Sequence, residues 1–175
     1  MSTPMQRLDR AVTSWFAENG VHFLRLGLGV VFFWFGALKL FPGMSPAEGL
    51  VAETVGWVVD PTWFLPVLAV WECAIGLGLI LNCMPRLTLL LLFAHMPGTF
   101  MPLVVCPELV WTDFPFGWTL EGQYIVKNFV LIGAGLTLVG RLRARADPTL
   151  AQRVRRVVSR PTLAVRSPDA LRRVS

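Results

Sequence analysis

Four long apolar stretches, separated by short segments rich in proline, glycine or charge, dominate the pattern of the chain. They cover residues 22–41, 63–82, 87–106 and 123–140. At about 1.5 Å of rise per residue, a helix of this length crosses the hydrocarbon core of a bilayer, which is about 30 Å thick. The pattern therefore predicts an all-α fold, an integral membrane four-helix bundle in one domain.

Composition supports a membrane protein. The chain has 175 residues, of which 54% are hydrophobic and 15% charged, and its mean hydropathy is +0.59. A soluble domain usually carries about a quarter charged residues. The first apolar stretch also lacks the small-residue cleavage site of a signal peptide, so we expect it to remain in the membrane.

The segments outside the apolar stretches complete the predicted organisation. Residues 1–20 carry apolar side chains at helical spacing, which predicts an interfacial amphipathic helix that ends at Asn19-Gly20. Residues 21–142 are the predicted membrane domain, and residues 143–175 an arginine-rich, basic cytoplasmic tail.

Several breaks are predicted within the membrane domain. Ser45, as an N-cap before Pro46, predicts a short helix to about Val59 on or in the outer surface. Pro97 and Pro102 each remove a helical hydrogen bond, so the third span should be kinked. The connection after it is rich in tryptophan, phenylalanine and proline and should lie in the outer headgroup layer.

The distribution of basic residues predicts the orientation. Arginines flank the cytoplasmic side of each span under the positive-inside rule, at Arg7, Arg10, Arg25, Arg86 and in the tail. We therefore expect a multi-pass protein of the bacterial cytoplasmic (inner) membrane with both termini in the cytoplasm. The net charge of +5 comes from the tail, so no nucleic-acid partner is expected.

Glu72 is the main candidate for function, because no other charge lies within ten residues of it on either side. An ionisable group at this depth costs roughly 2.5–3.5 kcal/mol on insertion scales, so it should face protein or water. His95 lies nine residues from Arg86 and should reach the same depth. A purely structural hydrogen bond between helices remains the alternative for both residues.

Two lysines lie closer to the predicted membrane centre than a surface residue would. Arg25 and Lys39, like Lys127 and Arg141, are separated by about 21 Å of helix, against about 30 Å of hydrocarbon. Lys127 adjoins Asn128 in a polar cluster, whereas for Lys39 snorkelling to the surface is equally open. The candidate ligand-binding site thus has Glu72 and His95 as its floor and Lys39, Lys127 and Asn128 as its mouth.

Metal and catalytic motifs are not found in the sequence. Cys73, Cys83 and Cys106 have no metal-ligand spacing, and nucleophile elbows, phosphate loops and dinucleotide fingerprints are missing. Whether the chain is an enzyme stays open, with a non-catalytic role favoured.

Five short motifs, in order, resemble the DoxX family of small bacterial four-helix membrane proteins. They are RLGLG from Arg25, GALKL from Gly36, Glu72 with Gly76, PGTFMP from Pro97 and EGQYIVKN from Glu121. The chain is also similar to reactive-chlorine-resistance membrane proteins. The resemblance covers about residues 20–142 and implies a four-helix bundle associated with membrane redox or oxidative-stress assemblies, without one common chemistry.

Three functional interpretations follow. The first is an accessory subunit of a redox or oxidative-stress system, with an outward-opening pocket for a quinone or other amphipathic small molecule. The second is a small proton-coupled transporter that uses Glu72, and the third is a membrane scaffold or assembly factor for a partner enzyme. The expected cofactor is a quinone or a lipid, and the expected partners are membrane lipids with a partner oxidoreductase or further copies of the chain.

The orientation can be tested by labelling single cysteines introduced at Glu53, Arg86, Asp113 and Arg160 in intact cells. We expect outside, inside, outside and inside in that order, because the basic residues stay in the cytoplasm. Any other order contradicts the predicted depths of Glu72 and His95.

Overall fold

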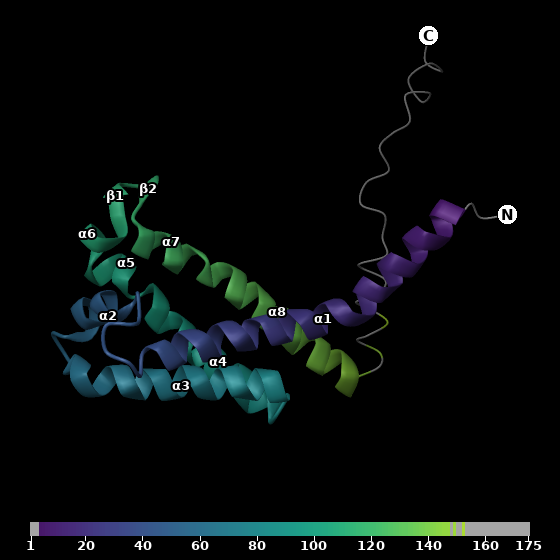
Figure 1. The fold of residues 1–175 in the computed structure, drawn as a ribbon, viewed down its shortest axis with the longest axis horizontal. Coiled ribbons are helices and arrows are strands. Elements are labelled where there is room, and N and C mark those ends of the chain that lie inside the picture. Colours follow the sequence, from purple (N-terminus) through teal and green to yellow (C-terminus); the bar gives the residue numbers. More distant parts are fainter. Residues whose placement is uncertain (1–3, 148, 150–151, 153–175) are drawn as a thin grey trace, which may run out of the picture. The chain divides into compact units, whose positions relative to one another are not determined.

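The computed structural model describes residues 4–147, 149 and 152 (Figure 1). Two compact units divide the chain after Val139, and the candidate site lies in the first. Most of the predicted tail, 143–175, lies outside the described residues. The elements are α1 Pro4–Leu38, α2 Glu48–Val55, α3 Pro61–Leu81, α4 Pro85–Phe100, α5 Pro102–Val105, α6 Pro107–Val110, β1 Trp111–Asp113, β2 Gly117–Trp118, α7 Leu120–Val126 and α8 Asn128–Ala146.

The prediction of four membrane helices is confirmed. Four helical stretches are long and apolar enough to cross a membrane: Pro4–Leu38, Pro61–Leu81, Pro85–Val105 and Leu120–Ala146. Most of their large apolar side chains are exposed, as expected where lipid takes the place of a protein core. Two spans are interrupted, one between α4 and α5 and one at Lys127 between α7 and α8.

The predicted end of the first helix at Gly20 is wrong. α1 continues through Asn19-Gly20 and has 35 residues. The side-chain amide of Asn19 donates to the Trp15 carbonyl at 3.0 Å, within the continuing helix. A glycine inside a helix costs only about 1 kcal/mol, which a long helix can absorb.

Glycines bring α1 and α3 together. A Cβ placed on Gly76 of α3 would lie 2.4 Å from the Phe33 nitrogen, and one on Gly36 of α1 would lie 2.8 Å from Cβ of Glu72. A Cβ on Gly29 would meet the carbonyl oxygen of Gly76 at 3.0 Å. Both helices therefore meet backbone to backbone and run antiparallel, a close approach that only small residues allow in a membrane.

The register of this packing means that α1 ends halfway along α3. Gly36 lies against Ala69, Glu72 and Cys73, and α1 ends two residues later, at Leu38. From that level, α3 continues for two more turns towards its start at Pro61. In Figure 1, α2 occupies the space beyond the end of α1, alongside the first turns of α3.

A helix that ends at this depth must satisfy its last carbonyl groups within the protein. The backbone amides of Lys39, Leu40 and Phe41 donate to the carbonyls of Gly36, Ala37 and Leu38 at 3.1 to 3.2 Å. The ammonium group of Lys39 donates to the fourth carbonyl, that of Phe35, at 3.3 Å. The charge of Lys39 also opposes the negative end of the helix dipole.

The short helix after α1 forms, but its predicted bounds are wrong. α2 begins at Glu48 and ends at Val55, and its N-cap residue is Ala47. The hydroxyl of Ser45 only accepts a long contact of 3.4 Å from the Ala47 amide. Instead, the Glu48 carboxylate accepts from the Gly43 amide at 2.7 Å and stabilises the turn before the helix.

Asp60 starts α3 with a side-chain cap. Its carboxylate accepts from the Thr62 amide at 2.9 Å, and Pro61 occupies the first helical position. This hydrogen bond holds the pKa of Asp60 below its ordinary value.

The third span is interrupted at Pro102, one of the two prolines at which a kink was predicted. There α4 gives way to α5, and the carbonyl of Gly98 accepts the Met101 amide at 3.3 Å instead of a helical bond from Pro102. Pro97 remains inside α4.

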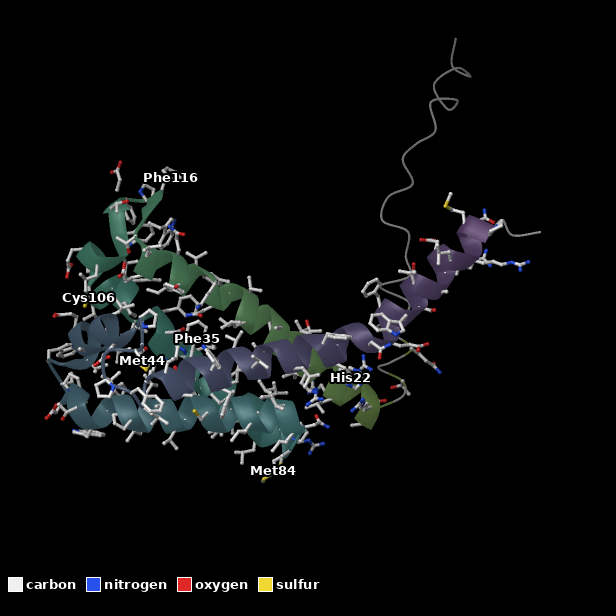
Figure 2. The ribbon with its side chains drawn as sticks, in the orientation of Figure 1. His22, Phe35, Met44, Met84, Cys106 and Phe116 are labelled. Atoms are coloured by element: carbon white, nitrogen blue, oxygen red, sulfur yellow. The ribbon has the colours of Figure 1, made fainter. Side chains whose placement is uncertain are left out.

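A small hairpin follows α6 that the sequence analysis did not predict. β1 pairs with β2 antiparallel, and the rings of Trp111 and Trp118 lie 3.7 Å apart between their centroids. Figure 2 shows Phe116 at the tip of the hairpin, where it is 89% exposed. Such exposed aromatic side chains agree with the predicted headgroup location, which stays a prediction.

Gly76→Ala tests the close packing of α1 on α3. We expect a loss of about 1–3 kcal/mol in stability, because the new methyl group meets the backbone of Phe33. Thermal unfolding in detergent measures it. The control is Gly27→Ala in α1, where a Cβ meets nothing within 4 Å. Equal melting temperatures for the two variants contradict the packing.

Candidate functional site

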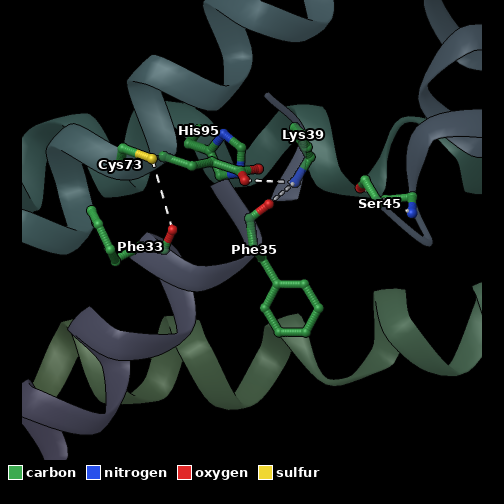
Figure 3. A network of polar contacts seen from close by, with 8 residues as sticks. Phe33, Phe35, Lys39, Ser45, Cys73 and His95 are labelled. Carbon is green, nitrogen blue, oxygen red and sulfur yellow. Dashed lines mark hydrogen bonds and ion pairs between the residues drawn. The ribbon is translucent and has the colours of Figure 1, made fainter. Parts of the chain in front are cut away.

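Glu72 lies at the centre of a buried network of polar groups. Its side chain is 9% exposed, and its Oε2 lies 2.6 Å from Nζ of Lys39, whose side chain is 6% exposed. His95 of α4 approaches from the other side, with Nε2 at 3.3 Å from Oε1 of Glu72. Figure 3 shows Lys39 and His95 at this network, with dashed lines from Lys39 to the Glu72 carboxylate and to the Phe35 carbonyl. The predicted meeting of Glu72 and His95 is therefore confirmed.

The predicted place of Lys39 at the mouth of the site is wrong. Its ammonium group is part of the floor, because the early end of α1 directs it onto Glu72. Snorkelling to the surface, the alternative left open by the sequence, does not occur. The sequence could not distinguish these outcomes without the register between Gly36 and Glu72.

Lys127 also lines the cavity and contacts aromatic rings. Its ammonium nitrogen lies 4.4 Å from the ring centroid of Phe35 and 4.3 Å from that of Tyr124. These distances are typical of cation–π interactions. In Figure 3 the Phe35 ring points away from the carboxylate network, towards the green ribbon of α7 and α8. Asn128, the next residue, is buried at the start of α8.

These five residues line one cavity with a volume of about 270 Å³. All the predicted site residues thus meet in one place: Glu72, His95, Lys39, Lys127 and Asn128. α2, the first half of α3, the end of α4 and α7 supply the rest of the wall. Much of the lining is apolar, from Leu50, Val51, Phe64, Leu68 and Met96 among others.

Several lining residues were missed by the sequence analysis. Phe35 looks like an ordinary lipid-facing aromatic residue, and only its spacing of four residues to Lys39 gave a signal. Tyr124 belongs to the polar cluster around Lys127 but was not predicted as a site residue. The α2 side chains were missed because the sequence placed that helix on the surface. Glu121, in the first turn of α7, also lines the cavity.

The described residues offer no group of three or more His, Cys, Asp or Glu side chains that could hold a metal ion. Cys73, Cys83 and Cys106 are free thiols. The Cys73 thiol contacts the Phe33 carbonyl at 3.7 Å, within the contact between α1 and α3. The chemistry of the site therefore rests on its charged and imidazole groups.

Residues 20–105, about half of the chain, match the family model described as DoxX. The chain belongs to the DoxX family. The matched segment includes Arg25, Gly36, Lys39, Glu72 and His95 and ends with α5. No curated protein and no solved structure matches the chain. This DoxX protein is thus a multi-pass membrane protein linked by its family to redox or oxidative-stress systems.

Arg25 has a structural part in the matched segment. Its guanidinium group donates to the carbonyls of Leu79 and Ile80, the latter at 2.9 Å. These carbonyls belong to the last turn of α3, where the Leu79 carbonyl also accepts the Asn82 amide at 3.3 Å. Arg25 and Lys39 therefore each link α1 to α3, one at either end of the contact between these helices.

Because Lys39 and Glu72 form a buried ion pair, we expect the stability losses of substitutions at the two residues not to add. Glu72→Leu alone should cost about 3–5 kcal/mol, because it leaves the buried Lys39 charge without its partner. Combining it with Lys39→Met removes both charges and should restore most of that loss. Thermal unfolding of the two single variants and the double variant in detergent measures the coupling. Additive losses would contradict an energetically coupled pair.

Proposed function

We propose that this DoxX protein is an accessory subunit of a membrane redox or oxidative-stress system that binds a quinone or another amphipathic small molecule in the cavity at Glu72. The observation that carries the proposal is one cavity with two kinds of wall. Charged and imidazole groups form its floor, and aliphatic and aromatic side chains form its sides. Pockets of this kind orient an amphipathic ligand with a few polar contacts.

The polar groups that line the cavity suit a ligand oxygen. His95 and Lys127 supply N–H donors, while the Glu72 carboxylate accepts hydrogen bonds and exchanges protons. Histidine beside a carboxylate is well suited to hold or release a proton at a bound oxygen. The family link to redox and oxidative-stress systems makes a quinone-type headgroup the favoured ligand.

A proton-coupled transporter is less well supported. On the other half of the bundle, the buried side chains of the described residues are mostly apolar, including Leu28, Leu79, Leu89 and Leu92. Thr88 is buried there too, but its hydroxyl donates to the carbonyl of Cys83 at 2.9 Å. A transport path needs polar groups or water along its length, and these residues do not supply them.

With both termini in the cytoplasm, the cavity lies in the outer half of the membrane, where a lipid-soluble ligand enters from the bilayer. The ligand would then pass between this cavity and a partner oxidoreductase or further copies of the chain. The scaffold interpretation predicts instead that the polar floor serves stability alone.

Ligand binding by Glu72→Gln in lipid nanodiscs tests the proposal. The amide keeps a hydrogen-bond acceptor for Lys39 but not the charge, so we expect quinone affinity to fall about tenfold or more, equivalent to about 1.4 kcal/mol. Titration with a short-chain quinone, followed by quenching of tryptophan fluorescence, measures it.

The matched control is Asp60→Asn, the same carboxylate-to-amide change on the same helix. Asp60 is exposed and outside the cavity lining, and asparagine is an equally good N-cap. It should bind quinone as the unchanged protein does. If Glu72→Gln binds quinone as tightly as the unchanged protein, the proposed site is refuted.

A further inference from the structure

The two lysines of the cavity differ in what they bind. Lys39 has a carboxylate partner at 2.6 Å and a carbonyl partner at 3.3 Å. The ammonium group of Lys127 contacts the faces of two aromatic rings. Among the described residues of the cavity, the ion pairs do not include Lys127. Lys127 is therefore the cation that a ligand can reach without breaking an existing ion pair.

The charges around Lys127 leave a place for an anion. Glu72 already faces Lys39 and His95. Glu121 also lines the cavity, and the ion pairs of the cavity's described residues do not join it to Lys127. An ammonium group has three donor hydrogens, and the rings of Phe35 and Tyr124 attract it without accepting a full hydrogen bond.

We propose that the ligand carries an acidic headgroup, bound as an anion against Lys127, with its apolar body along the wall of Leu50, Val51 and Phe64. This inference rests on the proposed function and names the ligand class of the same cavity. The shared chemistry is one ionised oxygen on an apolar body, as in an acidic hydroxyquinone or in a fatty acid.

The selectivity follows from desolvation. A neutral ligand that covers Lys127 displaces water from its ammonium group. In place of that water, the ligand offers only a neutral hydrogen-bond acceptor. An anionic ligand instead forms a charge-assisted hydrogen bond with the ammonium group, which is about twice as strong as a bond between neutral groups. The cation–π contacts keep the ammonium in place before the ligand arrives, so little side-chain freedom is lost on binding.

Two matched pairs of probes test this inference in nanodiscs of neutral lipid. The first is an alkylated hydroxynaphthoquinone, anionic at neutral pH, and its methyl ether. The second is a long-chain fatty acid and its methyl ester. In each pair, size and apolar surface are nearly equal and only the charge differs. We expect the anion of at least one pair to bind about tenfold or more tightly than its neutral analogue.

Lys127→Gln should reduce this preference to near unity, and Lys127→Arg should retain most of it. The control Arg86→Gln removes an exposed positive charge outside the cavity lining and should leave the preference unchanged. Thermal unfolding of each variant confirms that the bundle still folds. Selectivity for the hydroxyquinone alone identifies a quinone-type ligand, and selectivity for the fatty acid alone identifies a lipid-derived one.

Other outcomes overturn the inference. Equal affinity for the anionic and neutral members of both pairs refutes the acidic headgroup, while the proposed amphipath site stands. An anion preference that persists in Lys127→Gln refutes the role of Lys127. If none of the four probes nor the short-chain quinone binds, both the inference and the proposed function fail.

Discussion

The close contact between α1 and α3 is the constraint on which the rest of this membrane domain depends. Gly29, Gly36 and Gly76 let the two backbones touch, and this contact fixes the register of the helices. The register then places Leu38, the end of α1, beside the middle of α3. Beyond that point α2 lies alongside the first turns of α3, and both contribute to the wall of the cavity.

The buried polar groups are stable because each of them is hydrogen-bonded to a backbone carbonyl or paired with another charge. Lys39 satisfies the Phe35 carbonyl and the Glu72 carboxylate together. Arg25 does the same for the last carbonyls of α3 at the opposite end of the contact. The site is thus built from residues that also hold the helices, so its chemistry and its stability are coupled.

Much of this could be predicted from the sequence, because long apolar stretches and isolated charges are strong signals in a membrane. The four spans followed from length, the meeting of Glu72 with His95 from depth, and the interruption at Pro102 from the missing amide of proline. The position of Lys39, the bounds of α2 and the continuity of α1 through Gly20 did not. They depend on register and on carbonyl partners, which a single sequence does not contain. The pairing of Trp111 with Trp118 was missed because a strand of two or three residues has no periodicity to detect.

The early end of α1 also bears on how the protein assembles in the bilayer. α1 finds its closest partner in α3, while α3 and α4 are joined by the short turn Asn82–Met84 and can associate as a hairpin. Before docking, an inserted α1 has no carboxylate for Lys39, whose flexible side chain then reaches for the headgroups. Docking draws that ammonium group inward onto Glu72. In the two-stage scheme of membrane folding, the cavity therefore takes shape when the inserted helices associate and Lys39 pairs with Glu72.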